Sequence, residues 1–254
     1  MNVIKRLLES IVIASKKIQY EFSEKPQKSR VVYNIPYYSQ WESNNLVNEI
    51  LTEKLKAQND PKWKNSGAKT HEEYAIWSWS GCGMACLKMI LKDRLKKDYP
   101  LVELGKMCMK YGGYKDNSAK YDTNKTINQG KAVPSGYFEG LFYKQFLNFI
   151  RREFSLEGII IRPMVIGDIL KAISNHRYVI VSVNASIRDA NSIPPYKGGH
   201  LVLVTGFDLR KKLLYIHNPS GFYQESQENY PICFNDFNKF FSNRGIVISQ
   251  NKNF

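Results

Sequence analysis

Residues 80–91 read SGCGMACLKMIL, a cysteine between two glycines that leads directly into an apolar run. The glycines let the chain bend, and the helical spacing of the run predicts a helix from Cys82 to about Leu95. The free N–H groups and the dipole of a helix N-terminus favour a thiolate, which is the nucleophilic form of cysteine. Cys82 is therefore a candidate nucleophile. The other interpretation is a small buried apolar residue, and it is the better one for Cys86 inside the helix.

A histidine preceded by two glycines opens a long apolar strand pattern. Residues 198–208 read GGHLVLVTGFD, so the predicted strand fixes the backbone of His200 at its first position. Beside a thiolate, such a ring serves as a base when an acyl-enzyme forms and as an acid toward the leaving group. A lone strand histidine is more often a satisfied core residue, but the glycines and the Cys82 motif together favour the catalytic interpretation.

Residues 215–221, YIHNPSG, follow the next predicted strand, which a hairpin turn at 209–212 joins to the His200 strand. In a hairpin the end of one strand lies beside the start of the other. Asn218 is therefore predicted to reach the far nitrogen of His200 and to fix its tautomer. Asn-Pro is also a turn signal in its own right. His217 is expected on the opposite strand face from Asn218. Three histidines remain alternative bases: His71, His176 and His217.

The segment from Gly81 to Ile90 resembles the nucleophile motif of the bacteriocin-processing, double-glycine leader peptidases. The chain as a whole resembles their stand-alone bacterial relatives in the papain-like superfamily. The resemblance extends over residues 31–249 in scattered motifs, including NIPYYSQ at 34–40 and the helix-then-strand unit at 169–183. It implies an α+β fold of two lobes, in which a helical lobe carries the cysteine and an antiparallel sheet lobe carries the histidine.

The resemblance also implies a role for each matching residue. Cys82 corresponds to the nucleophile, His200 to the acid and base, and Asn218 to the residue that orients the ring. Gln40 would donate to the developing oxyanion together with the Cys82 N–H, and one such donor is worth roughly 3 kcal/mol. Relatives often have aspartate where this chain has Asn218, and papain-like enzymes tolerate either. Neither a cofactor nor a metal is implied.

The remaining patterns predict the same fold class, with helices in the first part of the chain and antiparallel strands in the last third. The predicted helices cover 45–57, a stretch after Pro100, 137–152, 165–176 and 234–241, and the predicted strands cover 31–36, 178–183, 200–205, 213–216 and 246–249. Two segments are candidate lids over a cleft: an apparent insertion at 42–76 and a polar loop at 112–136. We expect an N-terminal helix and linker over 1–30 and one enzyme domain over 31–254 that includes the insertion.

The composition is that of a globular protein, with 43% apolar and 24% charged residues. Four cysteines in 254 residues do not form a disulfide framework, and none has zinc-finger spacing. The net charge is 37 − 23 = +14, for which a basic solvated surface is the simpler interpretation and attraction of an acidic partner the other. Because the sequence has no nucleic-acid motif and no dense Lys/Arg tract, we expect no nucleic-acid partner. From the resemblance and the charge we expect a peptide or an acidic, acyl-carrier-type protein as substrate.

The N-terminal sequence MNVIKRLLESIVIASKKIQYEF resembles a signal peptide in composition, but Glu9 and Ser10 interrupt its apolar run and no small-residue cleavage site follows. Its apolar residues recur at helical spacing: Ile4, Leu7, Leu8, Ile11, Ala14 and Ile18. We expect this amphipathic helix to dock on the core. The alternative, a membrane or partner surface, rests on the basic residues Lys5, Arg6, Lys16 and Lys17. No stretch is long enough to span a membrane, and a cytoplasmic location is the default.

Three functions stay open at this point. The first is hydrolysis of a peptide or amide through a Cys82 thioester. The second is an amide-forming acyltransferase, transglutaminase-like or biosynthetic, in which an amine replaces water. The third is a non-catalytic binding protein, which the complete set of Cys82, His200 and Asn218 disfavours.

Overall fold

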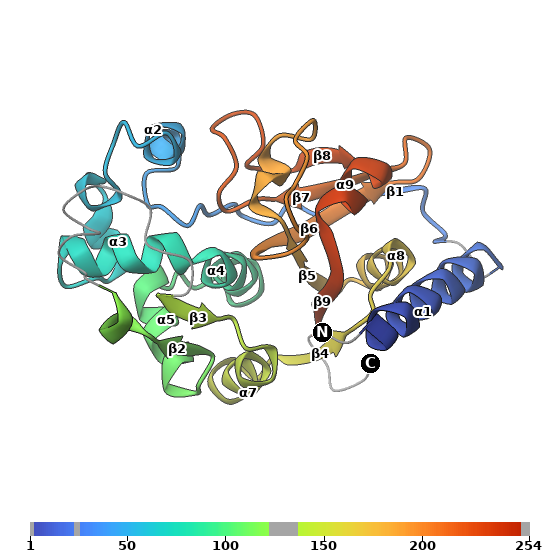
Figure 1. Cartoon of the computed structure of the whole chain (residues 1–254). Coiled ribbons are helices and arrows are strands. Elements are labelled where there is room, and N and C mark those ends of the chain that lie inside the picture. The colour runs from blue at the N-terminus through green and yellow to red at the C-terminus, as the bar shows by residue number, and fades with distance from the viewer. Residues whose placement is uncertain (1–2, 23–25, 122–136, 250–254) are drawn as a thin grey trace.

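The computed structural model of the chain describes residues 3–22, 26–121 and 137–249. A helical lobe and a sheet lobe lie side by side (Figure 1). The sheet lobe holds the strands of the larger sheet, and its helices are α8 (Ile166–Ser174) and α9 (Phe234–Phe240). The helices of the other lobe are α3 (His71–Ser80), α4 (Cys82–Leu95), α5 (Leu101–Lys110) and α7 (Tyr143–Phe154). Helices dominate the first part of the chain and antiparallel strands the last, so the predicted α+β fold is confirmed.

The sheet lobe is built on a seven-stranded antiparallel sheet with the order β4-β9-β5-β6-β7-β8, and β1 pairs with the far end of β6. Its strands are β1 (Arg30–Val32), β4 (Glu157–Ile161), β5 (Tyr178–Val183), β6 (His200–Asp208), β7 (Leu213–His217), β8 (Tyr230–Cys233) and β9 (Phe241–Ser249). The predicted strands over 178–183, 200–205 and 213–216 are confirmed within this sheet, and β6 runs three residues further than expected.

Strand β6 is buried along its whole length because the sheet has a core on each face. Leu201 and Leu203 belong to the core shared with the helical lobe, whereas Val202 and Val204 belong to the core on the opposite face. This explains why the sequence of β6 is apolar without alternation. On the second face lie α8 (Ile166–Ser174) and α9 (Phe234–Phe240).

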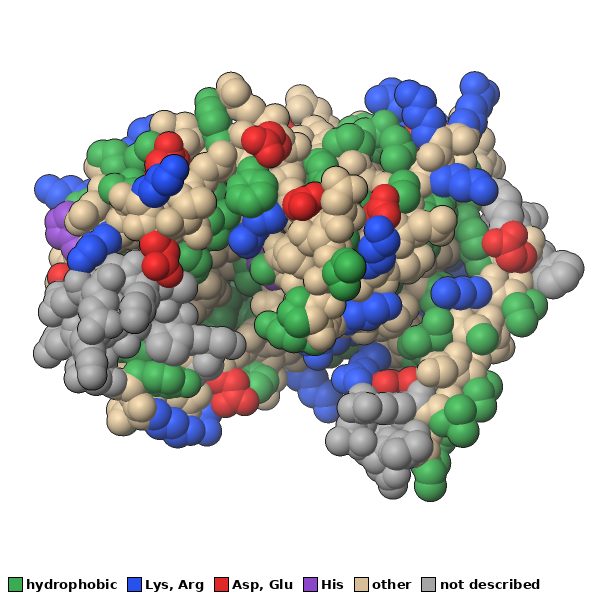
Figure 2. Space-filling view, turned by 45° about the horizontal axis from the view of Figure 1, so that its top comes forward, with side chains coloured by type: hydrophobic (Ala, Val, Ile, Leu, Met, Phe, Trp, Pro, Cys, Tyr) green, Lys and Arg blue, Asp and Glu red, His purple; other side chains and the backbone are tan. Residues whose placement is uncertain are grey.

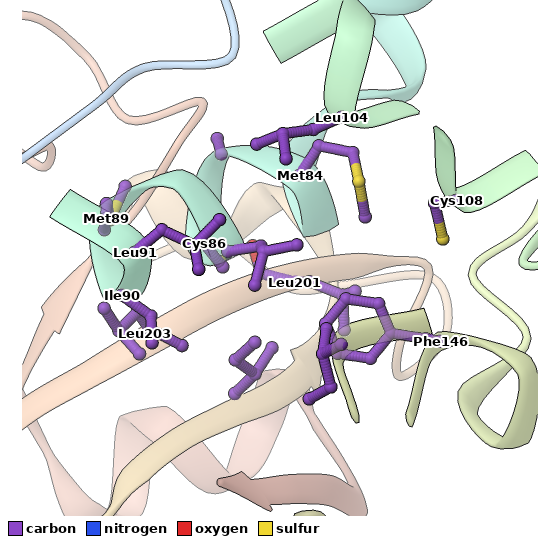
Figure 3. Close-up of a cluster of buried hydrophobic side chains, with 14 of the residues drawn as sticks. Met84, Cys86, Met89, Ile90, Leu91, Leu104, Cys108, Phe146, Leu201 and Leu203 are labelled. Carbon is purple, nitrogen blue, oxygen red and sulfur yellow. Dashed lines mark hydrogen bonds between the residues drawn. The ribbon is translucent and has the colours of Figure 1, made fainter. Parts of the chain in front are cut away.

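Helix α4 (Cys82–Leu95) is the centre of the helical lobe, and its nine consecutive residues Gly83–Leu91 are all buried. Figure 3 shows Met84, Cys86 and Leu91 of this helix among side chains from neighbouring elements, with Leu201 and Leu203 of β6 against it. A helix buried all round has no freedom to rotate, so its first residue is held in place relative to β6. Its neighbours are α3 (His71–Ser80), α5 (Leu101–Lys110) and α7 (Tyr143–Phe154).

The segment 42–76 is more structured than the sequence predicts. In place of one helix over 45–57 it contains 3-10 turns at Asn44–Leu46, Ala57–Asn59 and Trp63–Ser66 and the short helix α2 (Val47–Leu51). The expected loop up to residue 76 is also wrong, because α3 begins at His71, where the Thr70 side chain accepts a hydrogen bond from the Glu73 N–H. The segment packs around Trp41, Val47 and Tyr74 as a separate small core.

Two further predictions need correction. The helix predicted over 137–152 begins only at Tyr143, because residues 138–140 form β3 (Phe138–Gly140), which pairs with β2 (Tyr114–Asp116). Strand β4 was not predicted. It lies at the edge of the sheet, and its consecutive residues Ile159 and Ile160 are both partly exposed, so the strand shows no alternation of apolar and polar residues. The last part of the predicted polar loop, residues 122–136, lies outside the described residues.

Helix α1 (Val3–Phe22) confirms the predicted helix but not its predicted docking. It contacts the body through an ion pair between Glu9 and Arg162 at 2.9 Å and another between Lys16 and Asp168 at 3.2 Å. Its apolar residues remain exposed instead: Ile4, Leu7, Leu8, Ile11 and Ile18. Among the described residues, no helix is both long enough and apolar enough to cross a membrane.

Candidate active site

Cys82 is the first residue of α4, and its flanking glycines are required by close packing. A Cβ atom on Gly81 would lie 2.9 Å from the side chain of Leu101, and one on Gly83 would lie 3.1 Å from the side chain of Leu201. The Gly81 contact brings the N-terminus of α4 against the start of α5, and the Gly83 contact brings it against the start of β6. Gly83 thus allows the helix carrying Cys82 and the strand carrying His200 to approach each other.

The Cys82 thiol is protonated at rest because burial raises its pKa, and backbone hydrogen bonds at Leu201 and Gly83 only partly oppose this. The expected effect of the helix N-terminus, which favours a thiolate, is therefore outweighed by burial. The Leu201 backbone directly follows His200, so the strand that carries the histidine also contacts the sulfur. The thiol consequently needs a base in order to react.

His200 occupies the first position of β6 and is only 5% exposed. Its Nε2 lies 2.8 Å from Asn218 Oδ1, which also accepts a hydrogen bond from the Ser220 N–H at 3.1 Å. Because a backbone N–H donates to that atom, it is the amide oxygen, and His200 must carry its proton on Nε2. Nδ1 is left with its lone pair, which is the form required of a base.

The electrostatics keep this ring neutral. Burial lowers the pKa of His200 to about 4, against the opposing hydrogen bond to Asn218, and the charge of Arg188 lowers it further. The predicted meeting of His200 and Asn218 is thus present in the structure. Asn218 is itself buried, and its carbonyl oxygen accepts a hydrogen bond from the Tyr37 hydroxyl at 3.0 Å.

Ser220 and Arg188 extend this cluster, and the sequence patterns did not single them out. Ser220 Oγ lies 3.2 Å from His200 Nε2 and accepts a hydrogen bond from Arg188 Nη2 at 3.0 Å. Burial lowers the pKa of Arg188 to about 10. The Asn218 side chain was a signal for a turn that brings residue 220 close, because asparagine accepts hydrogen bonds from the backbone two residues on. Arg188 ends the 3-10 turn Ala185–Arg188 after β5 and had none.

Gln40 lies between the end of α3 and the Asn218–Pro219 turn. Its backbone N–H donates to Pro219 O at 2.9 Å, and its side-chain Nε2 donates to Ser78 O at 2.8 Å. The side chain is buried, and its Oε1 has no hydrogen-bond partner among the described residues. One N–H of the Gln40 side-chain amide therefore fixes the side chain, and the second N–H makes no further hydrogen bond among the described residues.

Two tyrosines also border Cys82 and were not predicted. A Cβ on Gly83 would lie 3.5 Å from the Tyr114 hydroxyl. The pKa values of Tyr114 and Tyr143 are raised mainly by burial and in small part by the charge that Cys82 would carry. Tyr114 of β2 thus lies beside the N-terminus of α4, and Tyr143 of α7 is near enough for a charge on Cys82 to raise its pKa slightly.

The other histidines are engaged elsewhere. His217 Nε2 donates to Ile35 O at 2.7 Å while its Nδ1 accepts from the Asn229 N–H at 3.0 Å, so both ring nitrogens are used. His71 packs on Trp63 with ring centroids 4.3 Å apart. His176 packs on Tyr33 at 5.3 Å. The described contacts therefore leave His200 as the histidine suited to act as a base.

Comparison with known proteins identifies the family of the chain. The model of a family described as "Peptidase_C39 like family" matches residues 32–247. Among solved structures, a crystal structure of a "putative C39-like peptidase" from Bacillus anthracis is 11% identical, covers 87% of this chain and 98% of its own, and superposes with a TM-score of 0.42. A search among curated proteins gave no match.

Proposed function

Since the chain belongs to the Peptidase_C39 like family, a group of papain-like cysteine peptidase relatives, we propose that it cleaves a peptide or amide bond through a thioester on Cys82. The observation that carries this proposal is the pair of His200 Nε2 and Asn218 Oδ1 at 2.8 Å, at the start of the strand that packs on the Cys82 helix. This pairing supports a neutral ring with a free Nδ1.

Acylation starts from a neutral pair. The pKa of the Cys82 thiol is raised and that of His200 is about 4, so His200 Nδ1 removes the thiol proton as the sulfur attacks. The new S–C bond pushes the carbonyl electron pair onto oxygen. When the C–N bond breaks, the imidazolium gives its proton to the leaving amine, which departs and leaves a thioester.

Deacylation uses the same residues in reverse. His200 removes a proton from water, the hydroxide adds to the thioester carbon, and the C–S bond breaks. The products are a free acid and the regenerated thiol, with one water molecule consumed. The ring returns to its neutral form, in which Asn218 holds the proton on Nε2.

Stabilisation of the oxyanion is assigned to Gln40 and the Cys82 backbone. Cys82 begins α4, where the first N–H groups have no partner within the helix. Gln40 has one side-chain N–H beyond the one bound to Ser78 O. Two donors held by buried backbone contacts need little reorganisation when the charge develops.

Amide formation is the second candidate, and the partly buried position of Cys82 near Tyr114 supports it. A site that excludes water lets an amine compete for the thioester. The acyl donor would then be an acidic carrier protein or peptide, which a chain of net charge +14 attracts. Either substrate reaches the same nucleophile.

The test supplies N-acetylglycine p-nitrophenyl ester with and without glycinamide and analyses the protein and products by mass spectrometry. We expect an acetylglycyl adduct on the peptide containing Cys82. Free acid as the sole product at every amine concentration supports the peptidase, whereas acetylglycyl-glycinamide supports the transferase. Cys82→Ala should abolish the adduct, and Cys86→Ala, which removes a buried thiol one turn away, should retain it. An active, unmodified Cys82→Ala variant would overturn the proposal.

A further inference from the structure

Helix α1 presents an uncovered apolar stripe. Within the described part of the chain, five of its large apolar side chains are 56% to 65% exposed, although Ile and Leu are usually buried. Their spacing places them on one face of the helix: Ile4, Leu7, Leu8, Ile11 and Ile18. Figure 2 shows hydrophobic side chains along the outer edge of this helix, at the lower right of the molecule.

The other face of α1 is attached to the sheet lobe. Glu9 pairs with Arg162, and Lys16 both pairs with Asp168 and donates to Pro163 O at 2.8 Å. The ring of Tyr20 packs so closely on Gly167 that a Cβ there would lie 2.4 Å away. Polar and aromatic contacts therefore hold the helix with its apolar stripe turned outward, and within the described part of the chain the stripe is open to a partner.

The charge around α1 indicates the chemistry of that partner. A cavity of about 930 Å³ lies between the attached face of α1 and the sheet lobe, and its basic side chains are on the side of the helix away from the stripe. On the flank of the stripe, Lys17 is exposed, and its charge adds to burial in lowering the pKa of the Lys197 amine. An anionic surface would relieve the repulsion between these two lysines, and the net charge of +14 favours such a surface.

We propose that α1 lies on an anionic lipid bilayer, with the apolar stripe in the boundary between headgroups and acyl chains. The stripe runs from Ile4 to Ile18, about 21 Å along the helix axis at 1.5 Å per residue. A helix lying in the interface buries such a face by roughly 5–10 Å, and neighbouring lysines pair with lipid phosphates. The helical lobe, including α4, lies away from α1 (Figure 1), so the Cys82 site stays clear of the bilayer.

The test is sedimentation of the full chain with vesicles. One set contains phosphatidylglycerol and phosphatidylcholine and the other phosphatidylcholine alone. The variant Leu7→Gln/Ile11→Gln removes the middle of the stripe, and Ile193→Gln, which changes a side chain 92% exposed but outside α1, is the matched control. We expect the double variant to bind the anionic vesicles at least about tenfold more weakly than the wild type, and the control to bind like the wild type.

The proposal is wrong if the wild-type chain does not sediment with anionic vesicles, or if it binds neutral vesicles equally well. It is also wrong if light scattering shows a dimer that the double variant dissociates, because a second copy then covers the stripe. The rate of Cys82 alkylation reports folding independently of any substrate: an unchanged rate in the double variant shows that a loss of binding comes from the stripe. None of these outcomes depends on the proposed peptidase activity.

Discussion

His200 Nε2 and Asn218 Oδ1 are 2.8 Å apart, although 17 residues separate them in the sequence. The hairpin of β6 and β7 brings them together, with Leu203 opposite His217 in the register. The Ser220 N–H identifies the amide oxygen and hence the tautomer of the ring. This contact is what the sequence predicted for the two residues; their catalytic roles stay a proposal.

Replacing Asn218 tests that contact. Asn218→Ala should lower kcat/KM by roughly 10- to 100-fold, because the ring loses the acceptor that holds its proton on Nε2. Asn218→Asp should keep the orientation but raise the pKa of His200, since a carboxylate favours the imidazolium. The acid limb of the pH profile should then move to higher pH in the aspartate variant. An unshifted acid limb would contradict the assignment of that limb to His200.

The pH dependence of Cys82 alkylation tests the resting state of the nucleophile. Because burial raises the pKa of Cys82, iodoacetamide should react slowly at pH 7 and faster only as the pH rises above the ordinary thiol range. Mass spectrometry of the Cys82 peptide gives the rate, and His200→Ala should leave the alkaline limb unchanged. Rapid alkylation near pH 6 that disappears in His200→Ala would instead show a preformed thiolate–imidazolium pair.

The site residues that the sequence predicted well are those whose position follows from the residues next to them in the chain. The helix from Cys82 and the strand from His200 were predicted to begin where the structure has them, because glycine pairs and long apolar runs mark both elements. The position of Asn218 followed from hairpin geometry. In each case residues nearby in the sequence determine where the side chain lies, so the sequence alone is sufficient to predict its position.

The missed features depend on contacts between distant segments. Arg188 reaches Ser220 across 32 residues, and Gln40 reaches Ser78 across 38, without any local pattern that announces either contact. The prediction that α1 docks on the core through its apolar face was wrong for a related reason. Amphipathic spacing identifies an apolar face but not which face meets the body, and here polar pairs such as Lys16–Asp168 decide it. The division at residue 30 stays a prediction.

Arg188 tunes His200 through charge and through Ser220. Arg188→Met should raise the pKa of His200, because it removes a positive charge that now lowers it. Arg188→Lys keeps the charge and should leave the pKa nearly unchanged. NMR titration of the histidine rings in the Cys82→Ala background measures the pKa directly. Arg30→Gln, which removes an exposed guanidinium on β1, is the control and should have no effect.

Asp60 anchors separate parts of the segment 42–76 to one another. Its carboxylate accepts hydrogen bonds from Ser43 Oγ at 2.6 Å, from the Lys62 N–H at 2.9 Å and from the buried Tyr74 hydroxyl. Asp60→Ala leaves these donors unpaired and should lower the free energy of unfolding by about 2–4 kcal/mol, measured by urea denaturation. Asp189→Ala, at an exposed position, should cost far less. Equal losses for the two variants would contradict the anchoring role.

The buried, neutral His200 should also make the fold sensitive to acid. Its pKa is about 4 in the folded chain against an ordinary 6.5, so between these values the unfolded chain binds more protons. The free energy of unfolding should therefore be fully retained above pH 6.5 and fall as the pH drops toward 4, by about 3 kcal/mol from this residue. Urea midpoints of wild type and His200→Gln, measured from pH 4 to pH 7.5, test this. The glutamine variant should lose that part of the slope, and equal slopes in both proteins would show that His200 is not the group that titrates.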